Sequence, residues 1–491
     1  MHLIDSDSRH TRRAFLRRAG HLGLAGSALP LALNLAAMGE AAAQTATDYR
    51  ALVCVFLFGG NDYANTVVTY DDPSYDAYNT IRGGGAGQTA GGIALAKSAL
   101  TPTLLAPTTA LANGRQYALH PSMTALANLF NTDAKLALQL NVGPLMVPLT
   151  KAQYASGNRS TYPLPPKLFS HNDQQSTWQS SSPEGSTVGW GGNIGDLVMN
   201  GNANSLFTCI SVSGNAVFLS GDNALSYQVG TGGAVSIGPA RTGGSTYGSA
   251  SVNQAMAALI QQARGHTLEN EYNRVTSRAI GAADTVNSSI GTAFPAGTFP
   301  TGNSLADQLA MVARLIRGRG TLGARRQVFF VSLGGFDLHD NLIANQPTLM
   351  TRLSDALAAF YQQMAAQGLA NNVTAFTASD FGRTLASNGD GSDHGWGSHH
   401  LVLGGAVKGK ALYGTPPPVS TGSTTADADQ WHVGQGRLLP TTSVDQYAAT
   451  LAKWFGVADA DLNGILPNLR NFNNVTAPSG IVYPRDVGFM V

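Results

Sequence analysis

The sequence predicts a layered α/β fold with a mostly parallel central sheet. Short, continuously apolar runs alternate along the chain with stretches of helical periodicity, and this alternation is typical of strands joined by helices. A run that is apolar throughout indicates a strand covered on both faces, as in the centre of a parallel sheet. The expected strands are residues 51–58, 135–141, 207–212, 327–333, 373–378 and 401–403.

Three stretches between these runs have the pattern of helices. They are SLADQLAMVARLIRGR from Ser304, residues 346–367, and SVDQYAATLAKWFG. In the last stretch, Ser443 is placed to cap the amino end of a helix and Gly456 is placed to stop it. The order of strand, helix, strand and helix supports the layered α/β fold.

Four segments rich in glycine, serine, threonine or proline lie between the predicted elements. They are residues 83–92, 228–252, 291–303 and 414–429. Their composition predicts surface loops or insertions. No repeat of fixed period and no sharp change of composition divides the rest, so we expect a single α/β domain over residues 44–491.

The charge balance excludes some classes of partner. The chain has 30 basic and 29 acidic side chains and a net charge of +1, so nothing indicates a nucleic acid or an anionic membrane as the partner. Its two cysteines, Cys54 and Cys209, lie in apolar runs, which predicts buried thiols and leaves a disulfide open.

The N-terminus has the pattern of a twin-arginine export signal. Arg12 and Arg13 precede a weakly apolar stretch, and small residues precede Gln44. The alternative is an uncleaved membrane anchor, but glycines and Pro30 interrupt the apolar stretch. We therefore predict a signal peptide over residues 1–43, export of the folded chain by the twin-arginine translocase to the periplasm or beyond, and no stable membrane anchor.

An aspartate follows three of the predicted strands. Asp62 lies in GGNDYAN, Asp337 in GGFDLHDN and Asp380 in SDFGRT. Because the carboxyl ends of parallel strands meet at one edge of a sheet, we expect these carboxylates to converge there. A single aspartate in such a place is typical of a turn or a helix cap, but three in the same context favour a metal site.

The segment GSDHGWGSHH adds imidazoles to this set. Asp393, His394, His399 and His400 lie within it, and His339 follows two residues after the middle aspartate. Histidine and aspartate together supply the nitrogen and oxygen ligands of divalent metals. The alternative is a polar loop that happens to be rich in histidine.

The sequence resembles the exported bacterial family catalogued as domain of unknown function fifteen-oh-one. Seven segments in the expected order carry the resemblance: TRRAFLRR, FGGNDYANTVV, FSHNDQQSTWQ, VSLGGFDLHDN, ASDFGRT, SDHGWGSHHLVLGGAVKGKALYG and DQYAATLAKWFG. That family is grouped with the alkaline phosphatase and sulfatase superfamily. The resemblance implies a doubly wound, three-layer α/β/α sandwich and a hydrolase site with one or two divalent ions, whether zinc, manganese, magnesium or calcium.

The resemblance also implies roles for individual residues. Asp62 resembles the metal ligand after the first strand, Asp337 with His339 the central ligands, Asp380 the following aspartate, and His394 the late histidine ligand. Asp393 beside it is a further candidate ligand.

The nucleophile of the superfamily is a serine, threonine or modified cysteine at the start of a helix. Ser170 in FSHNDQQSTWQ is the best match here, with Ser176 and Thr177 as rivals. Arg383 and His171 are candidates for balancing the charge of the reacting ester.

Three features depart from the superfamily pattern. Phe381 follows Asp380 where phosphatases have a ligating histidine and sulfatases an asparagine, so one metal position is incomplete. The Asp337 motif is compact, so Asp340 is an alternative ligand. The Cys-x-Pro-x-Arg signature is absent, which argues against a formylglycine sulfatase.

These observations predict an exported, metal-dependent hydrolase of phosphate esters, or of related sulfate or phosphonate esters, acting on a small molecule or a polymer. One alternative is a phosphatase-like scaffold that has lost turnover and binds a polymer or a protein in the periplasm. Another keeps the metal but uses it for redox or storage work.

Overall fold

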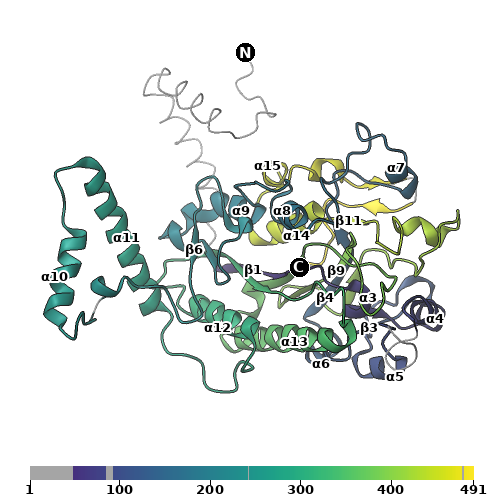
Figure 1. The fold of residues 1–491 in the computed structure, drawn as a ribbon, viewed down its shortest axis with the longest axis horizontal. Helices are drawn as coiled ribbons and strands as arrows, with labels where there is room; N and C mark the ends of the chain where they lie inside the picture. The colour runs from purple at the N-terminus through teal and green to yellow at the C-terminus, as the bar shows by residue number, and fades with distance from the viewer. Residues whose placement is uncertain (1–47, 84–91, 242, 478–479) are drawn as a thin grey trace, which may run out of the picture. The chain divides into compact units, whose positions relative to one another are not determined.

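A nine-stranded sheet forms the centre of the structure (Figure 1). The computed structural model describes residues 48–83, 92–241, 243–477 and 480–491, so the predicted signal peptide, residues 1–43, and most of segment 83–92 lie outside the described residues. From Asp48 to Val491 the chain forms one compact unit. The strands, in their order across the sheet, are β10 (Ala411–Tyr413), β4 (Leu136–Gly143), β9 (Ser398–Gly404), β8 (Val373–Ser379), β1 (Arg50–Leu57), β7 (Arg326–Leu333), β5 (Cys209–Ser211) and β6 (Ser226–Gln228), with β11 (Thr442–Ser443) beside β4.

One strand of this sheet runs against all the others. β9 pairs antiparallel with both β8 and β4, whereas every other pairing in the sheet is parallel. The predicted mostly parallel α/β sheet is therefore confirmed. The expected strand at 401–403 is longer than predicted, because it begins at Ser398 and includes the two histidines at its amino end.

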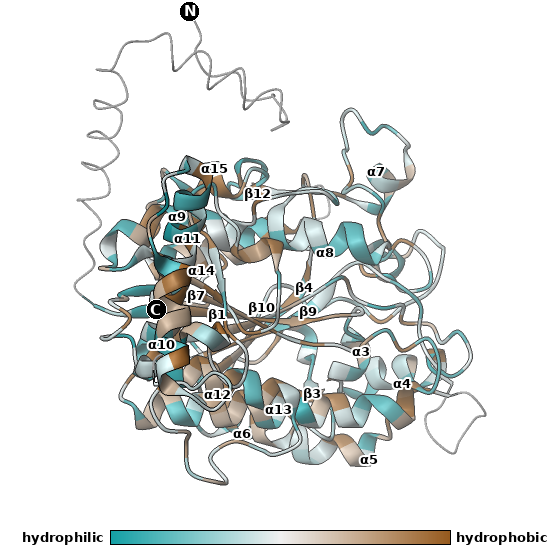
Figure 2. Ribbon diagram, turned by 60° about the vertical axis from the view of Figure 1, so that its left-hand side comes forward, coloured by the Kyte–Doolittle hydropathy of each residue, from teal (hydrophilic) through white to brown (hydrophobic). Residues whose placement is uncertain are grey.

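Helices cover both faces of the sheet (Figure 2). Side chains along β1 alternate between the two layers: Val53 and Val55 belong to one hydrophobic cluster, and Cys54 and Phe56 belong to the other. The first cluster is completed by α6 (Thr124–Asn131), α12 (Ser304–Arg317) and α13 (Leu342–Ala366), and the second by α8 (His171–Ser180), α9 (Trp190–Val198), α14 (Val444–Phe455) and α15 (Leu462–Ile465). This arrangement is the three-layer α/β/α sandwich that the resemblance implied.

The ends of the predicted helices follow local rules. Ser443 caps α14 in a capping box with Gln446, and Gly456 ends the helix in a left-handed conformation at φ 115°. At the start of α12, the side chain of Asn303 accepts hydrogen bonds from two backbone amides of the first turn.

Smaller elements lie around the sandwich. They are α3 (Tyr63–Thr66), α4 (Asp72–Ile81), α5 (Lys97–Leu100), α7 (Lys151–Ala155), α10 (Ala250–Gln261), α11 (Thr267–Ser289), β2 (Val67–Thr69), β3 (Tyr117–Leu119), β12 (Val475–Thr476) and β13 (Val482–Tyr483). The sequence did not predict α10 and α11. Cys54 and Cys209 are both buried and free. Among the helices of the described residues, none combines the length and apolar character needed to cross a membrane.

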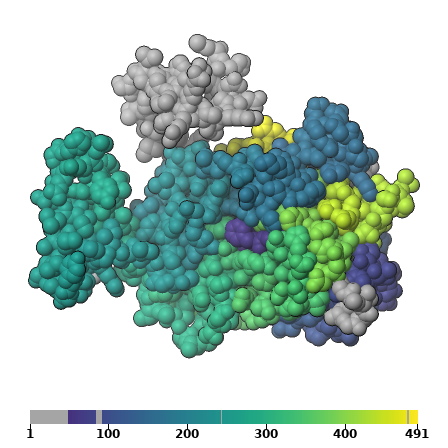
Figure 3. All heavy atoms as spheres, in the orientation of Figure 1, coloured from purple at the N-terminus to yellow at the C-terminus, as the bar shows by residue number. Residues whose placement is uncertain are grey.

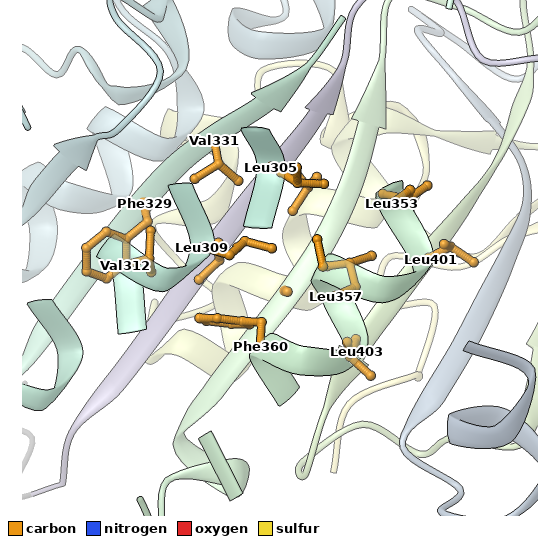
Figure 4. Packing of buried hydrophobic residues seen from close by; sticks show 14 of the residues in the cluster. Leu305, Leu309, Val312, Phe329, Val331, Leu353, Leu357, Phe360, Leu401 and Leu403 are labelled. Atoms are coloured by element: carbon orange, nitrogen blue, oxygen red, sulfur yellow. The ribbon is translucent and has the colours of Figure 1, made fainter. Parts of the chain in front are cut away.

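Replacing Leu309 by alanine tests the packing of one helical layer. Leu309 is fully buried in α12 and belongs to a hydrophobic cluster that includes side chains of α13 and β7 (Figure 4). The cavity left by Leu309→Ala should lower the free energy of unfolding by about 3 kcal/mol in a denaturant titration. Leu225→Ala is the control, because Leu225 is 70% exposed and its loss should change stability by less than about 0.5 kcal/mol. Equal effects of the two changes would contradict the packing described here.

Candidate metal centre

Four polar loops meet at one edge of the sheet. The carboxyl ends of β1, β7 and β8 lie there because these three strands are parallel neighbours. β9 runs in the opposite direction, so its amino end lies at the same edge. The loop before β9, which holds Asp393 and His394, is thereby brought to the loops that hold Asp337 and Asp380.

Glycine is required where the loop after β1 passes the loop after β7. Gly59 has φ 116°, and a Cβ built on it would lie 2.3 Å from the backbone nitrogen of Asp337. The Gly59 amide also donates a 3.2 Å hydrogen bond to Oδ2 of Asp380. The glycine in this motif therefore allows the three loops to approach one another closely.

Three side chains form a group that fits a metal ion. His171, Asp337 and His394 each offer a ligand atom, and the three atoms lie within 4.8 Å of one another. Nε2 of His171 is 3.4 Å from Oδ2 of Asp337, and Nε2 of His394 is 3.3 Å from Oδ1. Two imidazoles with one carboxylate are a donor set that suits zinc and other divalent transition metals.

The other nitrogen of each histidine ring is already held. Nδ1 of His171 is 2.6 Å from Oδ2 of Asp380, and Nδ1 of His394 donates a 2.8 Å hydrogen bond to the carbonyl of Phe169. Partners on the outer nitrogen of this kind are usual for histidines that bind metals, because they fix the ring and leave the inner nitrogen free. Nε2 of His171 and Oδ1 of Asp380 are buried without a hydrogen-bond partner among the described residues. The residues present therefore fit a divalent cation.

His339 and Asp393 adjoin this group. Nε2 of His339 lies 3.1 Å from Oδ1 of Asp337 and 3.0 Å from Nε2 of His394. Its Nδ1 lies 3.2 Å from Oδ1 of Asp393, which also accepts a hydrogen bond from Asn388. His339 is thus placed as a further candidate ligand, and Asp393 is placed to orient it.

The charges of the group are tuned by their neighbours. The hydrogen bond to Asp380 raises the pKa of His171, whereas burial lowers the pKa of His394. Burial by itself would raise the pKa of Asp337, but its hydrogen bond to the Arg383 guanidinium holds that pKa below the usual value. Asp337 is therefore a carboxylate, and His394 a neutral imidazole, at neutral pH, which are the forms that bind metal.

Asp62 faces a different set of partners. It caps α3 by accepting hydrogen bonds from two backbone amides, and its Oδ2 accepts from Arg82 at 2.5 Å and from the hydroxyl of Ser392 at 2.9 Å. Arg82 is fully buried, so this ion pair is shielded from water. The structure does not bring Asp62 into the group of His171, Asp337 and His394.

Arg383 lies beside the group but is fully buried. Its guanidinium donates to Asp337 and to the carbonyls of Gly59 and Ser392. In this arrangement it neutralises Asp337 and joins three loops, and any contact with an anion would require one of these bonds to be exchanged.

The neighbouring Phe381 ring packs against both histidines of the group. Its centroid is 4.9 Å from that of His171 and 4.7 Å from that of His394. Phe381 thus supports the two imidazoles at the position where the superfamily has a ligand.

Ser170 occupies the position before the first turn of α8. Its backbone is extended like that of a helix cap, but its hydroxyl does not accept from the helix and instead donates to Oδ2 of Asp173 at 2.9 Å. The rivals Ser176 and Thr177 donate to backbone carbonyls. Ser170 is the one of the three that lies between Phe169, whose carbonyl accepts from His394, and His171, a member of the group.

Two polar residues of α8 near the site were not predicted from the sequence. Gln175 donates a 2.9 Å hydrogen bond to Oδ2 of Asp380, and the buried Asp173 accepts from Ser170. Helical periodicity was the available signal: Gln175 lies four residues after His171, so both are on the face of α8 that meets Asp380. His171 and Gln175 together fix the orientation of the Asp380 carboxylate.

The last two histidines of GSDHGWGSHH do not join the group. His399 and His400 are buried in β9, and burial lowers the pKa of each to about 3. Nδ1 of His399 accepts from the backbone amide of Asn141, and Nδ1 of His400 is 3.2 Å from the hydroxyl of Thr377. They are neutral packing residues of the sheet. Of the three imidazoles in this segment, His394 alone lies in the metal group.

The geometry defines an α/β protein with a possible metal-binding group at the edge of a mostly parallel sheet. The chain belongs to the family described as "Protein of unknown function (DUF1501)", which matches residues 49–465. No curated protein matches it.

Solved structures with a similar arrangement share little sequence with the chain. The PsFucS1 sulfatase from Pseudoalteromonas sp. is 10% identical, with 91% of this chain and 75% of that chain covered and a TM-score of 0.34. The protein Ps i-CgsB is 11% identical, with 87% and 77% covered and a TM-score of 0.34. The alkaline phosphatase from the Antarctic bacterium TAB5 is 11% identical, with 75% and 95% covered and a TM-score of 0.29. The likeness to these proteins concerns the fold alone.

Replacing Asp380 by asparagine tests the contact between Nδ1 of His171 and the Asp380 carboxylate. Because the bond to the Asp380 carboxylate raises the pKa of His171, Asp380→Asn should lower that pKa in the metal-free protein, as measured by NMR titration of the imidazole protons. Metal binding requires the neutral ring, so in the native chain metal affinity should fall as the pH drops through the raised pKa of His171. In Asp380→Asn, metal affinity should fall at a lower pH than in the native chain, because the pKa of His171 is lower.

Asp393→Asn is the matched control, because Asp393 contacts His339 and not His171. It should leave the titration of His171 nearly unchanged. If both variants shifted His171 equally, the pairing of His171 with Asp380 would be wrong.

Proposed function

We propose that the chain is an exported, metal-dependent hydrolase of phosphate esters or related sulfate and phosphonate esters. One observation carries the proposal: the ligand group of His171, Asp337 and His394 includes the residue next to Ser170, at the amino end of α8. The paired arginines at positions 12 and 13 support export of the folded protein.

Residues of three segments share the work: the start of α8, the loop after β7 and the loop before β9. His171, Asp337 and His394 would hold a divalent ion, with His339 beside them. Such an ion, when bound, polarises an ester and favours an ionised oxygen nucleophile. Ser170 supplies the hydroxyl that attacks, and Asp173, which accepts its hydrogen bond, orients the hydroxyl and can take its proton.

The amino end of α8 favours an anionic substrate. The backbone amides of a first helical turn carry partial positive charge, and α8 is ten residues long. His171 lies in this turn. Arg383 lowers the negative charge of the site by pairing with Asp337. A phosphate or sulfate ester is therefore preferred over a neutral one.

The experiment is an ester screen with the exported protein, purified without chelator. Nitrophenyl phosphate, bis-nitrophenyl phosphate, nitrophenyl phosphonate and nitrophenyl sulfate are tested with zinc, manganese, magnesium or calcium. Activity should disappear with chelator and return with one of the metals. Ser170→Ala should lower the rate by about a thousandfold, as expected for loss of a nucleophile.

Ser176→Ala is the control on the same helix, because the Ser176 hydroxyl donates only to the backbone carbonyl of Pro183. It should retain most of the rate. Activity that persists with chelator, or a Ser170→Ala variant as active as the control, would contradict the proposal.

A second candidate is a scaffold that binds a polymer or protein partner without turnover. The apolar Phe381 ring favours it, because that ring packs on both histidines where a further ligand would be expected. Under this candidate no ester in the screen is hydrolysed, although the chain still binds metal.

A further inference from the structure

The α10–α11 hairpin extends away from the sandwich (Figures 1 and 3). Between Ala250 and Ala279, the buried residues are Asn253 and Asn273, and no apolar side chain in this range is fully buried. α10 has 12 residues, and a helix of this length is marginally stable alone, because burial of an apolar face supplies most helical stability. As it stands, the hairpin lacks that burial.

An exposed apolar stripe runs along α11. Leu268, Tyr272, Val275 and Ala279 are spaced by four, three and four residues, which places them on one face of the helix. Leu268 is 75% exposed, Tyr272 71% and Val275 49%. On α10, Val252 and Leu259 are exposed as well. A contiguous apolar stripe of this kind is typical of a surface that another protein covers.

The carboxyl half of α11 fixes the hairpin to the body. Ala282, Val286 and Ile290 belong to the same hydrophobic cluster as α12. The stripe is therefore presented on a helix that is anchored at one end, and the other end is open to a partner.

The charges beside the stripe identify the partner. Glu271, Arg274 and Arg278 lie on one flank of α11, with the acidic residue nearer the amino end. If two copies of α11 pair antiparallel about a twofold axis, this flank faces the same flank of the other copy. Glu271 of each chain then lies opposite Arg278 of the other, whereas in a parallel pairing this flank would face the other flank of the partner helix. The flank is thus complementary to itself.

We propose that a second copy of this chain docks on the hairpin. The two α11 helices pack antiparallel through their apolar stripes, and the two α10 helices complete a four-helix bundle. The hairpin has three arginines and two glutamates between Ala250 and Ala279, and so it lacks the strong positive charge that binding to an anionic membrane would use. The proposal is independent of the chemistry at the sheet edge.

Sedimentation velocity of the full exported chain tests the dimer. The native chain should sediment with twice the mass of one chain. Glu271→Arg and Arg278→Glu each create like charges across the twofold axis, and each should weaken the dimer at least tenfold. Mixing the two variants should restore a mixed dimer, because positions 271 and 278 are then basic in one chain and acidic in the other. The ion pairs of Glu271 with Arg274 and Arg278 within one chain do not predict that mixing the variants restores a dimer.

Tyr272→Asp tests the stripe, and it should abolish the dimer without unfolding the chain, since Tyr272 is 71% exposed. Ser288→Asp is the control, because Ser288 is exposed on the same helix outside the stripe. A native chain that is monomeric at its highest soluble concentration would overturn the proposal. So would a dimer that Tyr272→Asp leaves intact, a mixture that fails to restore it, or a monomer that binds lipid vesicles through the hairpin.

Discussion

The direction of β9 is the constraint on which the candidate site depends. Since β9 runs antiparallel to β8, its amino end meets the carboxyl ends of β1, β7 and β8, and the loop that holds His394 reaches Asp337. Were β9 parallel, that loop would emerge at the opposite edge of the sheet. Close contacts hold this junction: Gly59 passes against the backbone of Asp337, and Arg383 joins Asp337 to two carbonyls.

Asp380 connects the sheet to α8. Its buried carboxylate accepts from Gly59, from Gln175 and from the ring of His171, and so one side chain fixes the loop after β1 and the helix that begins next to Ser170. Through this contact Asp380 orients His171, and its role as a metal ligand stays a prediction of the resemblance. Asp393 has a similar position, because its carboxylate contacts Nδ1 of His339 and orients that ring. The ligand group thus has an inner set of side chains and an outer set of carboxylates that position the inner rings.

Much of the fold could be predicted from the sequence, because strands covered on both faces and capped helices leave local signals. The apolar runs at β1, β7 and β8 and the caps of α14 are examples. The direction of β9 leaves no local signal, so the burial of His399 and His400 in that strand could not be foreseen. Asp62 looked equivalent to Asp337, but its partner Arg82 is set by tertiary packing. The α10–α11 hairpin was not predicted, although Leu268, Tyr272 and Val275 have helical spacing in the sequence.

The most direct test of the account is the metal content of the exported chain, measured by elemental analysis after purification without chelator. We expect at least one equivalent of a divalent metal, lost in Asp337→Asn and in His394→Ala. It should be kept in His266→Ala, because His266 is an exposed histidine at the start of α11. A folded chain that binds no metal, or a metal that survives the loss of Asp337 and His394, would contradict the assignment of this group as a metal centre.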